Sequence, residues 1–383
     1  MKKYLYKVYR ANGTYITNWS DATFYGFKMQ LNSGMGECII KLARKFDDFG
    51  EDGDVKHNNR VDITVIDQDT SPEGLVIYSG YISGYSPYID GYTEGISITL
   101  LGYISKLATA ILKNGSTVSI TYSNTDPSQM VKNIIDRYRA ECTNPKINYT
   151  AATIEMTGQS NTYTFKLLTY ADALTKCVEL APANYWWFVG ADNVFYFQPK
   201  ANLATHRFVF NKHFKKIEVF KNMEKVVNRV LFTNGLTGAN AILKLYSDTD
   251  SSDDYDDRWE ILNDSNIIDE TTANNKGNAY LSKYKNADIT TEVEIIDNNE
   301  STAGYDIESI KPGDTCSFLG LNEITSKTFS GVLLIKSVSY TPDKASIEVE
   351  SLQESIARSQ NNLSKQLQEE IIADAPTTYP TVP

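Results

Sequence analysis

An acidic run, SDTDSSDDYDDRWE, holds the densest group of side chains that could bind a metal ion. Asp248, Asp250 and Ser252 fit the opening of an EF-hand loop, which places oxygen ligands at alternate positions. Asp253 stands where that loop requires glycine, and Trp259 stands where it requires a bidentate glutamate. We therefore interpret the run as a solvated acidic loop, and calcium binding there stays an open alternative.

The residues that serve most often in catalysis form no recognisable pattern. The sequence contains no H-E-x-x-H, no G-x-S-x-G and no phosphate-binding P-loop. His206 and His213 lie among Arg and Lys near an expected strand start, so we interpret them as ordinary surface residues. A glycoside hydrolase needs two carboxylates across a cleft, and nothing singles out one pair among 48 acidic residues. The sequence predicts no catalytic residue, no cofactor and no metal site, so we expect a protein that is not an enzyme.

The segment ANYWWFVGADNVFYF is strongly aromatic and could offer a surface on which sugars stack. Successive side chains of a strand point to opposite sides, however. We therefore expect Trp186 and Trp187 to divide between a core and a face toward a neighbouring subunit, because Tyr and Trp are favoured at interfaces. Both residues are candidate interface residues.

Composition limits the class of protein. The 383 residues are 41% apolar, with 25 Tyr and 15 Phe, which favours pleated sheet in a folded chain over a disordered one. The net charge of −11 argues against a grip on nucleic acid, which needs a basic surface. No C-x-x-C occurs, and the start MKKYLYKVYR lacks a signal peptide's apolar core. We expect synthesis inside a cell, with reduced cysteines and no stable membrane insertion.

Short strands and two helical regions divide the chain into units. Residues 1–111 read as strands of a small antiparallel β-barrel, with turns at NSGMG and SPEG. Residues 112–204 read as an α+β insertion: Asp126 caps one helix, Thr169 and Asp172 have capping-box spacing at another, and a hairpin turns at GADN. Residues 205–236 and 307–352 are expected to form a second, discontinuous barrel around a second α+β insertion, 237–306.

The two expected barrels echo each other, so we expect an internal duplication. SITLLGYISKLATA aligns without a gap with SIEVESLQESIARS, 249 positions later. Tyr85-x-Pro87 recurs as Tyr340-x-Pro342, and VDITVID has a counterpart in DTCSFLG. FKMQLNSGMGECII resembles KIEVFKNMEKVVN. The expected fold is therefore mainly β with α+β insertions, containing two similar small antiparallel β-barrels.

This order of units, together with the motifs VDITVID…YSGYISGYSP, VVNRVLFTNG and ESIKPGDTCSFLG…FSGVLLIKSVSYTP, resembles the phage tail hub family. That family is also called baseplate hub or late control protein D, and it is similar to the first part of type VI secretion spike proteins. The resemblance implies a structural homotrimer in the virion tail tip, made in the host cytoplasm. It implies a pseudo-six-fold ring that joins the six-fold tail tube to the distal tip.

The implied partners are the tail tube or distal tail protein, the tape-measure protein, and a distal spike or fibre protein. DNA would pass through a central channel without specific binding. Two alternatives stay open: a tail-associated lytic or carbohydrate-binding protein, and the hub of a phage-like injection or secretion particle. The chain stops soon after the second barrel, whereas some relatives continue into a hydrolase or fibre domain, which puts wall cleavage by this subunit in doubt.

The last residues, 353–383, read as a polar helix and a Pro-rich tail. Tyr379 and Val382 are the sizeable apolar side chains of that tail, so they are candidate interface residues. We expect the tail to dock in extended form on the distal protein, because proline limits the ordering entropy that docking would cost.

Overall fold

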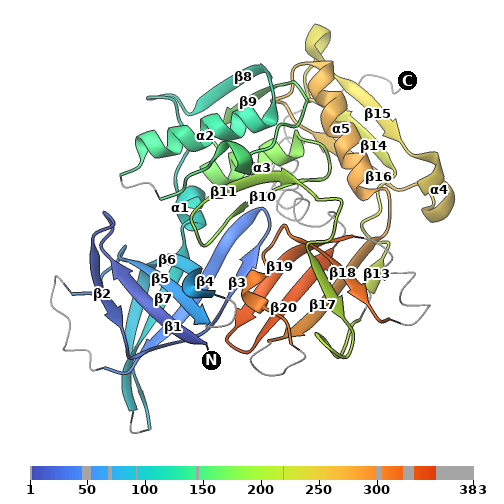
Figure 1. Cartoon of the computed structure of the whole chain (residues 1–383). Helices are drawn as coiled ribbons and strands as arrows, with labels where there is room; N and C mark the ends of the chain where they lie inside the picture. The colour runs from blue at the N-terminus through green and yellow to red at the C-terminus, as the bar shows by residue number, and fades with distance from the viewer. Residues whose placement is uncertain are drawn as a thin grey trace.

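The computed structural model of the chain describes residues 2–44, 53–67, 71–91, 93–143, 146–218, 220–297, 304–321 and 332–350. The described strands form one sheet of 15 strands, one of three and one of two (Figure 1). The protein is therefore mainly β with helical insertions, as the sequence predicts.

The first half of the large sheet comes from the start of the chain. Its strands pair in the order β3-β4-β7-β6-β5-β1-β2, and each neighbouring pair is antiparallel. Buried and more exposed side chains alternate along β1 and β3, so one face of this half packs against the core. The strands are β1 (Lys3–Tyr9), β2 (Tyr15–Trp19), β3 (Ala22–Gln30), β4 (Ser33–Leu42), β5 (Arg60–Asp67), β6 (Ser71–Asp90) and β7 (Thr93–Gly102).

The second half pairs in the order β13-β17-β20-β19-β18-β12 and joins the first through antiparallel pairing of β19 with β3. If β13, β17, β20, β19, β18 and β12 are matched with β3, β4, β7, β6, β5 and β1, the two halves have the same strand order. One pairing differs in direction: β12 is parallel to β18, whereas β1 is antiparallel to β5. The strands are β12 (His206–Val209), β13 (Phe220–Asn222), β17 (Asp288–Ile296), β18 (Thr315–Leu319), β19 (Leu333–Thr341) and β20 (Lys344–Glu350).

Neither half forms a closed barrel from its described strands, because the strands at the two ends of each path do not pair with each other. The strand order, rather than closure, is what the halves share. One apolar core nevertheless serves both of them, and it includes Phe27 and Ile98 from the first half and Tyr340 and Ile347 from the second.

The α+β insertion follows β7, and its helices lie above the two sheet halves in Figure 1, while its strand Tyr185–Val189 joins the large sheet by pairing with β4. Its helices begin where the sequence indicates: Asp126 accepts a hydrogen bond from the Ser128 amide, and Thr169 accepts one from the Asp172 amide. The expected hairpin is also present. The elements are α1 (Ile104–Thr109), β8 (Ser119–Thr125), α2 (Pro127–Glu141), β9 (Asn161–Lys166), α3 (Tyr170–Glu179), β10 (Tyr185–Val189) and β11 (Phe195–Pro199), with a 3-10 turn at Ala151–Thr153.

The second insertion lies between β13 and β17. Its three-stranded sheet has the order β15-β14-β16, and α5 packs against β14 and β15. The elements are β14 (Arg229–Thr233), β15 (Leu243–Ser247), α4 (Thr249–Tyr255), β16 (Trp259–Asn263) and α5 (Glu270–Tyr284), with a 3-10 turn at Gly238–Asn240; a further such turn, Ile307–Ser309, precedes β18.

The position of β14 differs from the sequence expectation. The sequence predicts residues 229–233 in the second barrel and 288–296 in the insertion, whereas β14 lies in the three-stranded sheet and β17 lies in the large one. Apolar and polar residues alternate along β14, and this pattern fits any sheet that has one buried and one exposed face. Val230 and Phe232 turn to the buried side, so the pattern alone does not say which sheet receives the strand.

Candidate functional site

The β10–β11 hairpin meets both sheet halves at one junction, where Trp186 and Phe188 share their apolar core. Asn32, in the turn between β3 and β4, has a left-handed backbone with φ of 52°. Its amide donates to the Trp187 carbonyl at 2.7 Å, and its side-chain oxygen accepts from the Trp187 amide at 3.1 Å. Beside it, β10 pairs with β4 in parallel, where a Cβ on Gly34 would approach the Val189 carbonyl oxygen to 3.1 Å. The hairpin is thereby fixed to the first half.

A buried polar cluster joins the two halves. Lys2 Nζ lies 2.6 Å from Asp297 Oδ1 and 2.7 Å from Glu308 Oε2, and the Lys2, Asp297 and Glu308 side chains are 7%, 1% and 3% exposed. Tyr340 donates its hydroxyl hydrogen to Glu308 and lies 3.2 Å from the Tyr4 hydroxyl. Burial, with the Glu308 charge, raises the pKa of Tyr340, so the phenol stays protonated. A paired buried cluster of this kind fixes the two halves in one arrangement.

Next to this cluster, Asp306 is a perturbed acid. Burial and a hydrogen bond with Glu308 raise the pKa of Asp306 to about 6. Burial is the largest cause and the neighbouring Glu308 adds to it, and structural ion clusters also shift pKa values in this way, so the shift does not by itself identify a functional acid.

A cavity of ≈ 630 Å³ lies at the same junction. Its walls come from both sheet halves, from the hairpin and from the loop before β18, including Phe27, Trp186, Glu308 and Gly313. Gly313 has φ of 94°, and a Cβ there would lie 2.5 Å from the Trp186 ring, so the loop closes tightly over the indole. The Trp186 Nε1 hydrogen has no acceptor within the described part of the chain. The volume suits a small ligand or a few side chains of a partner.

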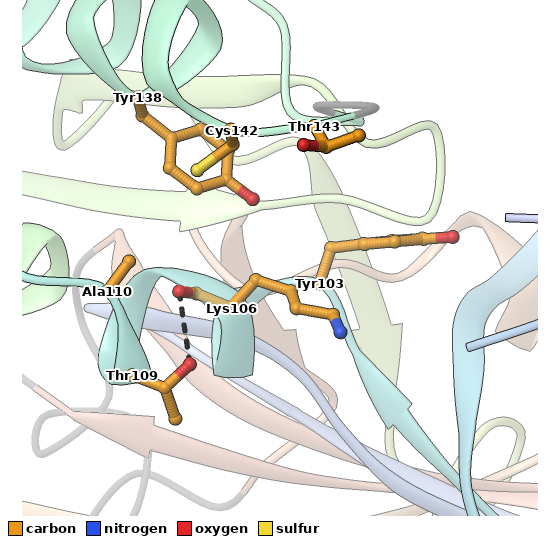
Figure 2. Close-up of a pocket in the computed structure, with 7 residues that line it drawn as sticks. All are labelled: Tyr103, Lys106, Thr109, Ala110, Tyr138, Cys142 and Thr143. Carbon is orange, nitrogen blue, oxygen red and sulfur yellow. Dashed lines mark hydrogen bonds between the residues drawn. The ribbon is translucent and has the colours of Figure 1, made fainter. Parts of the chain in front are cut away.

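A smaller pocket of ≈ 290 Å³ opens between α1 and the end of α2 (Figure 2). Tyr103 and Lys106 line one side, and Tyr138 and Cys142 line the other. Burial raises the pKa of the Cys142 thiol and lowers that of Lys106. A thiol with a raised pKa is protonated at neutral pH and is a weak nucleophile, so the pocket lacks the environment of a reactive cysteine.

A second buried ion cluster joins the two insertions. Lys276 Nζ on α5 lies 2.5 Å from Asp264 Oδ2 and 3.3 Å from Glu179 Oε2 on α3. The Tyr163 hydroxyl donates to Asp264 at 3.3 Å. Burial alone would raise the pKa of Asp264, but the charges of Lys276 and Lys176 together with hydrogen bonds to the carboxylate outweigh it and hold that pKa below its usual value. The two insertions also share one apolar core, which includes Phe165 from the first and Phe232 from the second.

Trp186 and Trp187 lie on opposite sides of β10, in two different cores. They are 6% and 1% exposed, and of the two only Trp186 lines the junction cavity. Their place in an interface stays a prediction. Tyr379 and Val382 lie outside the described residues, as does the expected helix and tail at 353–383, so their docking role also stays a prediction.

The histidines differ from the sequence interpretation. His206 and His213 are only 4% and 7% exposed, because aromatic side chains of the second half pack around them. His206 contacts the Tyr305 hydroxyl and an Asp314 oxygen, both at 3.0 Å. The interpretation as surface residues was wrong, since charged sequence neighbours do not reveal which side chains cover a strand.

The acidic run does not form an EF-hand loop. Asp248 accepts a hydrogen bond from the Ser251 amide and caps α4, so residues Thr249–Tyr255 form a helix rather than the solvated loop that the sequence suggested. Within the described ranges, no group of three or more His, Cys, Asp or Glu is arranged to hold a metal ion. Nor does that part of the chain contain a helix long and apolar enough to cross a membrane.

The fold is that of phage tail proteins, and several solved structures share it. The 43 kDa tail protein of prophage MuSo2 from Shewanella oneidensis has a TM-score of 0.61 at 13% identity, covering 92% of this chain and 99% of that one. Prophage tail protein gp18 from Listeria monocytogenes has a TM-score of 0.57 at 12% identity, covering 95% and 99%. No protein-family model and no curated protein sequence matches the chain.

A chain of the Francisella PdpA–VgrG complex is similar at a TM-score of 0.50 and 8% identity, covering 93% of this chain and 59% of that one. At these identities the similarity establishes the fold. The resemblance to phage tail hub and secretion spike proteins, which the sequence motifs indicated, is confirmed at that level.

Sequence reasoning missed the residues that join the units. Lys2 and Glu308 are 306 positions apart, and Glu179 and Lys276 are 97 apart, so no local pattern brings either pair together. A charged residue on an otherwise apolar face of a strand or helix can be recognised in the sequence. It indicates that a charge is buried, but it does not identify the residue that pairs with it.

Proposed function

We propose that the chain is a structural hub of a phage tail tip. The observation that supports this most is the fold shared over 92% of this chain and 99% of the MuSo2 tail protein. Because the similarity covers nearly all of both chains, it concerns the whole architecture and not a single shared domain. The proposed role is mechanical: the subunit joins parts of a particle and needs no reaction of its own.

The proposed assembly is a homotrimer with pseudo-six-fold symmetry. The support is the matching strand order of the two sheet halves, which offers two similar units in each chain. Three such chains around one axis present six similar units and can join a six-fold tube to a three-fold tip. In this proposal the halves arose by duplication. The second unit comprises 205–222, 288–297 and 304–350, with 223–287 inserted.

The proposed ring surrounds a channel for tape-measure protein and DNA. The net charge of −11 per chain supports a neutral or acidic wall, because a dense basic lining would retain passing DNA through counterion release. The tail tube above and a spike or fibre protein below are the proposed neighbours, and residues 373–383 are proposed to dock on the lower one.

A second candidate is the hub of a phage-like injection or secretion particle. The observation that favours it is the similarity to a chain of the Francisella PdpA–VgrG complex. Both candidates predict the same trimer. Electron microscopy of particles that incorporate the tagged chain distinguishes them, because only a phage particle carries a DNA-filled head.

A further inference from the structure

The outer side of the β15-β14-β16 sheet carries a group of exposed apolar side chains around its centre, and polar side chains such as Arg229 and Asn263 lie on the same side toward the strand ends. Leu231 at the centre of β14 is paired in register with Leu245 on β15 and with Ile261 on β16. Trp259 precedes Ile261 by two residues and shares its side of the strand. Leu245, Trp259 and Ile261 are 41%, 55% and 55% exposed. We call these four residues the outer face.

The opposite side of the same sheet is covered by α5. Val230 and Phe232 are fully buried there, and the Tyr246 ring lies against Gly277 of α5. Figure 1 shows α5 lying alongside this sheet, and α5 contacts β14 and β15. No described element covers the outer face, so a cluster of large apolar side chains is left in solvent, and such clusters mark interaction sites.

An acidic border lies directly beside this face. The helix α4 connects the end of β15 to the start of β16, where Trp259 stands. Five aspartates on and after α4 are exposed: Asp250, Asp253, Asp254, Asp256 and Asp257. Arg229 neutralises the charge of one of them, because its Nε lies 3.1 Å from Asp257 Oδ1. The border therefore presents net negative charge along one end of an apolar surface.

Charge distinguishes among possible occupants. A second copy of this chain carries a net charge of −11 and an identical acidic border. The chain's own residues 351–383 contain four acidic side chains and two basic ones. Both would meet repulsion at the border, whereas complementary charge steers association and favours the correct partner. We propose that the outer face binds a segment of a different protein in which apolar side chains are flanked by Lys or Arg.

This inference does not depend on the proposed role in a tail. The four tryptophans of the chain supply a probe, because Trp19, Trp186 and Trp187 are at most 6% exposed whereas Trp259 is 55% exposed. Acrylamide quenching of the full-length protein therefore reports mainly on Trp259. Two synthetic 18-residue peptides are added in turn; they share one stripe of leucines and carry either Lys or Glu at every polar position.

We expect the Lys peptide to shield Trp259 from acrylamide and the Glu peptide to leave quenching unchanged. Leu245→Thr/Ile261→Thr should weaken Lys-peptide binding about tenfold, because apolar contact area is lost. Asp253→Asn/Asp254→Asn should weaken it about threefold and flatten its salt dependence. The matched controls are Val76→Thr/Ile89→Thr and Glu73→Gln/Glu94→Gln, which remove exposed apolar side chains and charges from the first sheet half; they should bind as the parent does.

Five results would overturn the proposal. If both peptides shield Trp259 equally, binding does not require positive charge. If neither peptide shields it, the outer face does not bind such a segment. An equal loss in the control variants makes the binding a general effect of net charge. Shielding of Trp259 that grows with protein concentration alone assigns the face to a second copy. Stronger quenching after removal of residues 351–383 assigns it to the chain's own end.

Discussion

Lys2 Nζ lies 2.7 Å from Glu308 Oε2, and this buried contact joins the first strand region to the loop before β18. The two sheet halves are therefore held by ionic contacts as well as by the β19–β3 pairing and the shared core. These three kinds of contact together fix the two halves relative to each other.

Glu308→Gln removes the negative charge of Glu308 while keeping the shape of its side chain. We expect it to lower the free energy of unfolding by about 2 kcal/mol, because Lys2 keeps Asp297 but loses its second buried partner. Urea unfolding measures the change. The control is Glu294→Gln, whose partner Lys344 is exposed, so its cost should stay below about 0.5 kcal/mol. Equal costs for both variants would contradict a special role for the buried contact.

Lys276→Met removes the cation between Asp264 and Glu179, and Glu179 keeps its ion pair with Lys176 while Asp264 loses the pair with Lys276. We expect a loss of about 3 kcal/mol, since an unpaired buried charge is costly. Lys244→Met, which breaks an exposed pair with Glu270, is the control. Urea unfolding monitored by circular dichroism gives both values. If Lys276→Met is as stable as the control, the two insertions are not held together by this cluster.

Asp306 should make the protein less stable as the pH rises. The folded pKa of about 6 lies above the ordinary value of 3.8, so the folded state binds the proton more tightly than the unfolded state does. The contribution to stability is then present below pH 4 and is lost as the pH rises through 6. Asp306→Asn should match the parent at pH 4 and exceed it by about 1 kcal/mol at pH 8, after allowance for partial exposure. Urea unfolding at both pH values is the test, and a variant that is less stable at pH 8 would refute it.

The sequence predicted local structure well because local signals determine it. Asp126 and Thr169 cap helices where their spacing indicated, and residues 97–102 and 346–350 of the two similar segments lie in the strands β7 and β20. It failed where the answer depends on distant packing. The exchange of β14 and β17 between sheets, and the burial of His206 under Tyr305, follow from contacts that no short pattern contains.

The candidate interface residues show the same limit. Alternation along β10 correctly separates Trp186 from Trp187, but alternation gives no information on whether a face meets solvent, a partner or a second core. Trp259, whose indole is exposed, lies instead in β16, a strand that the sequence did not predict because it directly follows the acidic run.

The proposed channel should not bind DNA. We expect purified protein to bind duplex DNA with a Kd weaker than about 10⁻⁴ M at physiological salt, because the net charge of −11 opposes phosphate contact. Fluorescence anisotropy with a labelled duplex measures this. Binding at roughly micromolar concentration, with a steep salt dependence, would indicate a continuous basic surface and contradict the proposed channel.

The mass of the purified chain in solution, measured by light scattering after size-exclusion chromatography, tests the proposed hub most directly. The proposal predicts a particle of three times the mass of one chain across a range of concentrations, and electron microscopy of that particle should show six similar units around its axis. A monomer at every concentration, or a dimer, would contradict the proposed trimeric ring.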